Sequence, residues 1–329
     1  MKLIKRVKGL KDFYLHRGQE VRIYKDKICV GDKELKAEPD DDFFEENGNL
    51  TKCKLGKSGI CMLYNNGVFE EEKLRYFDAI YFAPDVYYSS KDEEGLSRFS
   101  FMENGTEYLF EIESEESLSR IEYNPGNSVL MIPTSDDRQL LFYTKTGERL
   151  WVYEEEEVVK GTELKIVRFP SVVDDVVVII SEIITECIRK AQGFNIRTGE
   201  KLWELRDDDC PRHLFEGDDK MLYGCLSIYD ELVLCRLDPF TGKFDKWAVK
   251  RDEGISVCSW NVSMHNNRLY YSSNRPGCEF GIIDCGKKEF VESVALGLKS
   301  GYQIGAPKIS DGKAYVFSRF AGELRVYEL

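Results

Sequence analysis

The chain has 329 residues, of which 42% are hydrophobic, and 59 acidic against 46 basic side chains give a net charge of −13. This acidic balance argues against nucleic acid as a partner, because phosphate contacts need a basic face. No stretch of 18 apolar residues could span a membrane, and the basic first ten residues lack the apolar core of an export signal. We therefore expect a cytoplasmic protein.

Strand patterns follow one another from the N-terminus onward. Residues 3–7 mix apolar and basic side chains, and eight hairpins come after them, each with a polar turn before a short apolar run. A second set of turns carries glycines 31, 67, 105, 147, 199, 242 and 286, which are 36–52 residues apart. A β-propeller blade of four short strands takes about 40–50 residues. The sequence thus predicts an all-β propeller of four-stranded antiparallel blades.

The number of turns predicts how the propeller closes. There are eight first hairpins but only seven glycine turns, because the chain ends where the eighth turn is due. The N-terminal strand can supply the missing outer strand by pairing with the C-terminal strand, which would cover two exposed edges. We expect one domain over residues 1–329, with residues 1–9 as the closing strand. The eight blades are predicted at 10–38, 50–76, 78–113, 117–154, 165–206, 212–250, 255–296 and 301–329. Merging the two short first repeats gives seven blades, which is the alternative.

Three of the glycine turns share one motif. Each has a threonine before the glycine and a tryptophan shortly after it, and these tryptophans are Trp151, Trp203 and Trp247. The motif resembles the repeat of pyrroloquinoline-quinone-type (PQQ-like) β-propellers, which include quinoprotein alcohol dehydrogenases. The resemblance implies that each tryptophan wedges between neighbouring blades and that the Thr-Gly turn links the two outer strands. It implies a fold rather than an activity.

Catalytic and metal-binding patterns are absent from the sequence. Quinoprotein enzymes hold their cofactor beside a disulfide between adjacent cysteines, and this chain has no Cys-Cys dipeptide. The three histidines, His16, His213 and His265, are far apart, and no phosphate loop or nucleophile motif occurs. The ten cysteines show no CxxC pair and are expected to be free thiols. We predict no enzyme activity, no cofactor and no metal.

Acidic runs mark the candidate binding surface. In a propeller, the connection from one blade's fourth strand to the next blade's first strand lies on the same face as the connection between second and third strands. Runs at 91–94, 113–116 and 135–137 are assigned to that face, together with the candidate partner-binding residues. These are Asp40, Asp41, Asp42, Glu154, Glu155, Glu156, Glu157, Asp207, Asp208 and Asp209.

The acidic face has two interpretations. The runs could serve solubility alone, or they could form a recognition face for a basic protein. We favour a non-enzymatic protein-interaction propeller, for example an immunity-type inhibitor of a basic toxin. The alternative is a small-molecule or glycan-handling propeller enzyme with its site at the central channel.

Overall fold

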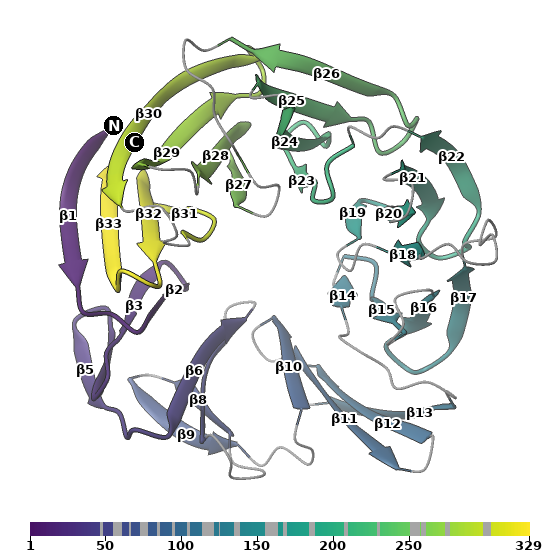
Figure 1. The fold of residues 1–329 in the computed structure, drawn as a ribbon. Coiled ribbons are helices and arrows are strands. Elements are labelled where there is room, and N and C mark those ends of the chain that lie inside the picture. Colours follow the sequence, from purple (N-terminus) through teal and green to yellow (C-terminus); the bar gives the residue numbers. More distant parts are fainter. Residues whose placement is uncertain are drawn as a thin grey trace.

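The structure is a computed structural model. It describes residues 1–46, 49–54, 61–65, 67–72, 78–83, 86–93, 96–103, 106–113, 122–124, 126–134, 139–154, 164–166, 170–183, 188–206, 210–228, 231–250, 257, 261–273, 277–298 and 304–329. Within these residues the strands form eight antiparallel sheets, seven with four strands and one with five. The sheets follow one another around a common centre (Figure 1). The predicted all-β architecture of four-stranded blades is confirmed.

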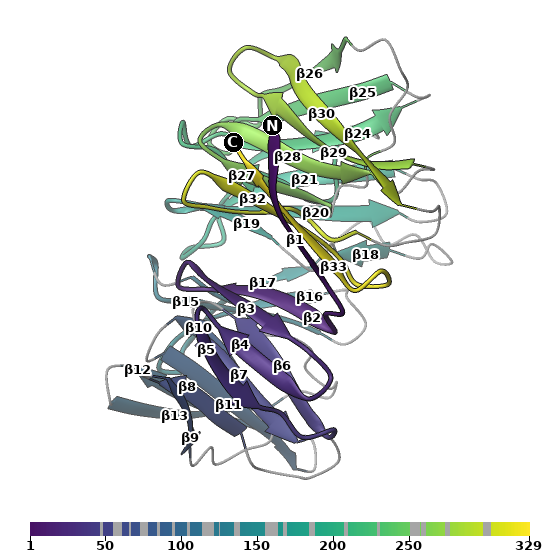
Figure 2. The same ribbon diagram turned by 90° about the vertical axis from the view of Figure 1, so that its left-hand side faces the viewer.

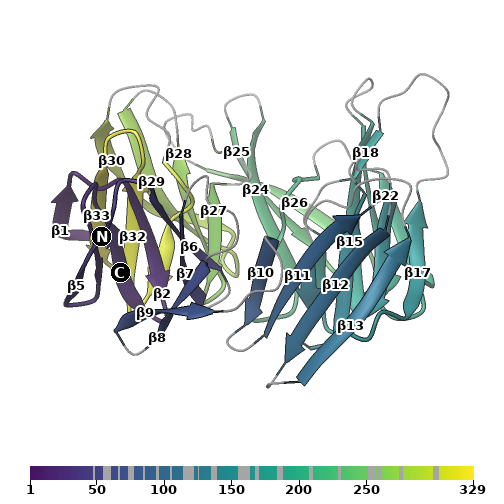
Figure 3. The ribbon, with the colours of Figure 1, turned by 90° about the horizontal axis from the view of Figure 1, so that it is seen from below.

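The first four sheets, called blades 1 to 4, take up the N-terminal half of the chain. Blade 1 contains β2 (Asp12–His16), β3 (Gln19–Ile23), β4 (Lys27–Val30) and β5 (Lys33–Lys36). Blade 2 contains β6 (Asp41–Glu46), β7 (Asn49–Lys54), β8 (Cys61–Asn65) and β9 (Val68–Glu72). Blade 3 contains β10 (Asp78–Ala83), β11 (Val86–Glu93), β12 (Leu96–Glu103) and β13 (Thr106–Glu113), which lie side by side in Figure 3. Blade 4 contains β14 (Glu122–Asn124), β15 (Val129–Pro133), β16 (Gln139–Thr144) and β17 (Arg149–Glu154).

Blades 5 to 8 follow in the same order, from the innermost strand outward. Blade 5 contains β18 (Leu164–Ile166), β19 (Ser171–Val173), β20 (Val176–Ile183), β21 (Ile188–Asn195) and β22 (Lys201–Arg206). Blade 6 contains β23 (Phe215–Glu216), β24 (Leu222–Ile228), β25 (Glu231–Leu237) and β26 (Phe244–Val249). Blade 7 contains β27 (Val262–His265), β28 (Arg268–Ser273), β29 (Gly277–Asp284) and β30 (Glu289–Leu298). Blade 8 contains β31 (Lys308–Ser310), β32 (Lys313–Ser318) and β33 (Glu323–Glu328), with β1 (Lys2–Lys8) as its outermost strand.

The hydrophobic core is divided among the spaces between blades. In every described cluster of buried apolar side chains, the members come from two consecutive blades. Blades 8 and 1 share such a cluster as well, in which Phe13 stacks on Tyr315 with ring centroids 5.7 Å apart. The middle strands are therefore apolar on both faces, as in β15, where all five residues are buried. Outer strands such as β22 instead alternate exposed and half-buried residues.

The acidic segment near residue 40 corrects one predicted boundary. The second blade begins at Asp41, not near residue 50, because the stretch predicted as a connection forms β6 and pairs with β7. Phe43 and Leu50 anchor this hairpin in the cluster shared with blade 1. Asp41 is 2% exposed, and its carboxylate lies 2.7 Å from Nζ of Lys52. Apolar packing and a buried ion pair thus place the acidic residues in a strand.

The first and last strands of the chain share blade 8. β1 pairs antiparallel with β33, the pairing expected from the sequence, and Figure 2 shows both termini close together. The Glu323 carboxylate, 6% exposed, accepts hydrogen bonds from Arg6 of β1 at 2.7 Å and from Arg325 at 2.6 Å. Burial opposes ionisation of Glu323, but the two guanidinium groups outweigh it and lower the pKa of this carboxyl. One buried carboxylate therefore fastens β1 to the sheet.

This ion pair predicts a pH-dependent stability. A carboxyl with a lowered pKa in the folded state stabilises fully above its unfolded pKa, and the contribution is lost as the pH falls through the folded pKa. We expect Glu323→Gln to lower the free energy of unfolding by about 1–3 kcal/mol at pH 7. The difference from wild type should shrink in urea unfolding below about pH 4. Glu328→Gln, at the exposed end of β33, is the control. A difference at pH 3 as large as at pH 7 would contradict this role.

Tryptophans join blades 4, 5 and 6 at their outer strands. The Trp151 indole of β17 stacks on Phe142 and donates a hydrogen bond to the Ile196 carbonyl of blade 5 at 2.8 Å. Trp203 of β22 repeats this contact with the Pro239 carbonyl of blade 6 at 2.7 Å. The tryptophans are therefore wedges between blades, as the resemblance implied.

The glycine turns complete the wedge. Gly199 and Gly242 have φ angles of +71° and +73°, which glycine adopts without strain. Each lies against the indole of the preceding blade, since a Cβ at Gly199 would be 2.6 Å from Trp151 and one at Gly242 would be 2.7 Å from Trp203. At the next junction Lys288 replaces this contact, with its Nζ 4.0 Å from the centre of the Trp247 ring. The glycine and the tryptophan of the repeated motif are thus the residues through which successive blades contact each other.

Alanine substitutions at two glycines test the wedge. Gly242→Ala should lower the free energy of unfolding by about 1–3 kcal/mol, because the new Cβ meets Trp203 and the φ angle is positive. Gly286→Ala is the matched control in the next blade, where the nearest atom to a Cβ is 3.5 Å away. Thermal unfolding of both variants is the measurement. Equal losses of stability would show that the turn does not depend on close contact with the indole.

Candidate functional site

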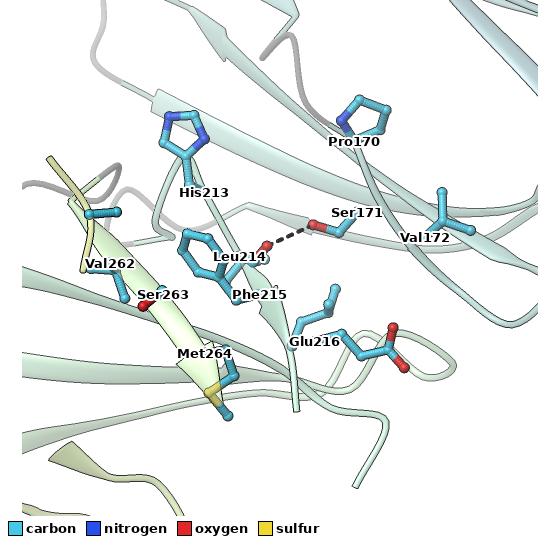
Figure 4. Close-up of a pocket in the computed structure, with 12 residues that line it drawn as sticks. Pro170, Ser171, Val172, His213, Leu214, Phe215, Glu216, Val262, Ser263 and Met264 are labelled. Carbon is cyan, nitrogen blue, oxygen red and sulfur yellow. Dashed lines mark hydrogen bonds between the residues drawn. The ribbon is translucent and has the colours of Figure 1, made fainter. Parts of the chain in front are cut away.

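The innermost strands of four blades surround a cavity of about 750 Å³. They contribute short segments: residues 170–172 at β19, 213–216 at β23, 262–264 at β27, and Ala306 before β31. Such short strands leave side chains at the centre half-exposed, because no further strand covers them. Figure 4 shows Pro170, Phe215 and Met264 on different sides of this space. The cavity size lies within the range of small-molecule sites.

Serine hydroxyl groups fix the spacing of the inner strands. Ser171 of blade 5 donates a hydrogen bond to the Leu214 carbonyl of blade 6 at 3.1 Å, drawn as a dashed line in Figure 4. Ser263 of blade 7 donates to the Pro307 carbonyl of blade 8 at 2.6 Å. A serine hydroxyl has one proton, so both protons are already used. These residues present oxygen lone pairs to the cavity.

Two of the described residues that line the cavity have titratable side chains, His213 and Glu216. Burial, and next the charge of Arg212, lower the pKa of His213, so the imidazole is neutral at pH 7. Arg212 itself is paired with the Glu182 carboxylate. The Glu216 side chain is 39% exposed and lies 3.1 Å from Nζ of Lys220. The same lysine is 3.3 Å from Asp174, so two carboxylates share one ammonium group.

The predicted acidic residues are in different environments. Asp41 is buried and paired with Lys52, so it cannot contact a partner, which corrects its assignment as a binding residue. Asp42 is 52% exposed and lies 3.9 Å from Nζ of Lys11, and Asp40 is half-exposed. Glu154 is exposed at the end of β17. Glu155, Glu156, Glu157, Asp207, Asp208 and Asp209 lie outside the described residues.

Glu154 also borders a second, smaller groove. This groove, of about 340 Å³, lies between the outer strands of blades 4 and 5 and contains Lys190, Lys201 and Glu204. Burial works against ionisation of Glu204, but the neighbouring lysines and Gln192 outweigh it and lower the pKa of this carboxyl. Glu154 is therefore not in a purely acidic environment. Two lysines line the same groove.

The described residues contain no group of three His, Cys, Asp or Glu side chains placed to hold a metal ion. Nor does any helix in the described ranges have the length and apolar character needed to cross a membrane. The cysteines described with their side chains are free thiols, and all but Cys53 are buried. Burial raises the pKa of Cys285 to about 12, which makes this thiol unreactive at neutral pH.

The sequence predicted a site at the central channel as the alternative, but it did not point to the residues that line the cavity. Its lining comes from strands of only two to four residues, too short for any periodic pattern, and the conspicuous motifs belong to the outer strands. In the sequence, His213 is only one of three histidines that are far apart. The feature of the sequence that could have indicated a role for His213 is its position just before the innermost strand of a blade. A half-exposed side chain there faces the centre of the propeller.

Solved structures share this architecture at low sequence identity. BamB from Moraxella catarrhalis is 11% identical, with a TM-score of 0.61 over 99% of this chain and 97% of that chain. The fold is that of a β-propeller. The propeller domain of Cps50 (Swd1) from Myceliophteria thermophila is 9% identical, with a TM-score of 0.51 over 100% of this chain and 99% of that chain. Dihydro-heme d1 dehydrogenase NirN, in complex with DHE, is 9% identical, with a TM-score of 0.58 over 92% of this chain and 72% of that chain.

No protein-family model matches the sequence, and no curated protein matches it. At 9–11% identity, the likeness to the solved structures shows the propeller fold alone. Propellers carry many unrelated activities, so function has to be inferred from the surfaces of this chain.

Proposed function

We propose that the chain is a non-enzymatic, cytoplasmic propeller of the PQQ-like repeat type that binds a basic protein on its acidic face. The observation that carries the proposal is the placement of exposed carboxylates where the chain passes from one blade to the next. Asp42 lies just after the connection that follows β5, and Glu154 ends β17. Both connections follow a fourth strand, so they belong to one face of the propeller. In the sequence, the same type of connection carries residues 155–157 and 207–209.

Electrostatics supports a basic partner for this face. Like charges on neighbouring connections add their fields, and the chain as a whole has a charge of −13. The opposite face carries the glycine turns, where acidic and basic residues alternate, as in Lys145, Glu148 and Arg149, and turns such as that at Asp174, whose carboxylate is paired with Lys220. A basic protein approaching the molecule is therefore drawn to the acidic face. A toxin inhibited by this chain is the concrete form that we favour.

A salt-dependence measurement tests the proposal. The partner is first isolated from the source cell by cross-linking to the full-length chain, and its association rate is then measured at 50 and 300 mM salt. Screening over about 8 Å at physiological salt should slow association as the salt concentration rises. Changing residues 154–157 and 207–209 to serine should lower the rate at 50 mM salt by about tenfold or more.

The control carries Glu148→Ser and Glu200→Ser in the glycine turns of the opposite face. It should associate at the wild-type rate, and thermal unfolding should show that all three proteins are equally folded. An affinity that stays unchanged in the seven-residue variant would reject the acidic face as the binding surface, leaving solubility as the role of these residues.

The central cavity favours a second candidate, a propeller that handles a small molecule. Its volume suits such a ligand, and its lining is mostly apolar. A glycan is the less suitable ligand, because Glu216 is the only carboxylate among the described lining residues. Hydrolysis of a glycosidic bond ordinarily uses two carboxyl groups.

A further inference from the structure

The polar atoms around the central cavity are mostly hydrogen-bond acceptors. Ser171 and Ser263 have each donated their proton to a backbone carbonyl of the next blade, so only their lone pairs remain for a ligand. Glu216 contributes a carboxylate, and the Met264 thioether is a weak acceptor. Among the described lining residues, His213, as a neutral imidazole, is the one side chain with an N–H group.

A negative charge lies in the lining of the cavity, on Glu216. Glu216 and Asp174 share the single ammonium group of Lys220, so this group of three carries a net negative charge. Arg212 and Arg189 share the Glu182 carboxylate, so this second group of three carries a net positive charge, but none of its members is among the described lining residues. A ligand that donates hydrogen bonds and carries a positive charge is therefore complementary to the cavity, whereas a carboxylate ligand would be repelled.

The apolar residues that line the cavity determine which kind of ligand can carry the positive charge. Pro170, Val172 and Phe215 supply apolar surface, and all three are half-buried, so part of each side chain remains uncovered. An aromatic face also attracts cations, because its π-system carries negative charge density. The cavity therefore suits an apolar or aromatic stem that ends in a cation.

We propose that the central cavity binds a primary ammonium group on a short apolar or aromatic stem, with Glu216 as its counter-ion. A free organic amine and a lysine side chain of another protein share this chemistry. The site goes beyond the proposed acidic face and uses none of its residues. Changes to residues 154–157 and 207–209 should leave it intact, so the two proposals can fail separately.

Titration with matched probes tests the site. The full-length protein is titrated with 2-phenylethylammonium and with 3-phenylpropionate, which has a similar stem and the opposite charge. The ammonium probe should bind with saturation, and the carboxylate probe should bind at least tenfold more weakly. Glu216→Gln keeps the side-chain shape but removes the charge, and should weaken binding of the ammonium probe by about tenfold.

Two further variants test whether the ammonium probe binds in the central cavity. Glu289→Gln removes a 58%-exposed carboxylate that is also paired with a lysine, but on the outer strand β30, and should bind the ammonium probe like wild type. Ala306→Phe places a ring in the cavity and should abolish binding while thermal unfolding shows a folded protein. Equal binding of the two probes to wild type, or an unchanged affinity in Glu216→Gln, would overturn the proposal.

A peptide distinguishes the two sources of the ammonium group. The probe is a capped pentapeptide with a central lysine between glycines, tested for competition with 2-phenylethylammonium. Competition at similar concentrations would identify a protein-borne lysine as the ligand class, and binding of the small amine alone would identify a free amine. Both results support the site, whereas binding of neither probe rejects it.

Discussion

The arrangement of blades 4, 5 and 6 depends on an indole of one blade lying against a glycine turn of the next. A single blade cannot bury both faces of its middle strands, so every apolar cluster spans two blades and the blades must meet in a fixed position. Trp151 and Trp203 set that position by packing and by hydrogen bonds to carbonyls of the following blade. The turn can approach the ring only because glycine has no Cβ.

The blades are joined at the centre by a different kind of contact. Ser171 and Ser263 bridge the innermost strands of neighbouring blades through hydroxyl-to-carbonyl hydrogen bonds. At the junction of blades 5 and 6, Trp203 packs on the outer side and Ser171 bonds on the inner side, so the two blades are held at two distances from the centre. Connections on the surface of the molecule are in general open to charge and sequence variation.

The sequence predicted those features that repeat along the chain and are long enough to form a recognisable pattern. Glycine turns at a regular interval revealed the blades, and the Thr-Gly-to-Trp spacing revealed the wedge, because each reflects a local backbone requirement. The innermost strands escaped prediction because β23 has only two residues. Asp41 was misjudged because acidity suggests a connection, whereas its burial depends on Lys52 in the paired strand. A site at the central channel was the alternative prediction, but its lining residues could not be predicted, since they come from four blades.

The central question is which face of the propeller contacts a partner protein. Hydrogen–deuterium exchange of the full-length chain, free and in complex with its partner, compares the two faces in one experiment. We expect slower exchange, on binding, in the connections that follow β5, β17 and β22, and no change in the turns at Gly147, Gly199 and Gly242. Protection confined to the glycine turns, with the acidic connections unchanged, would contradict this expectation.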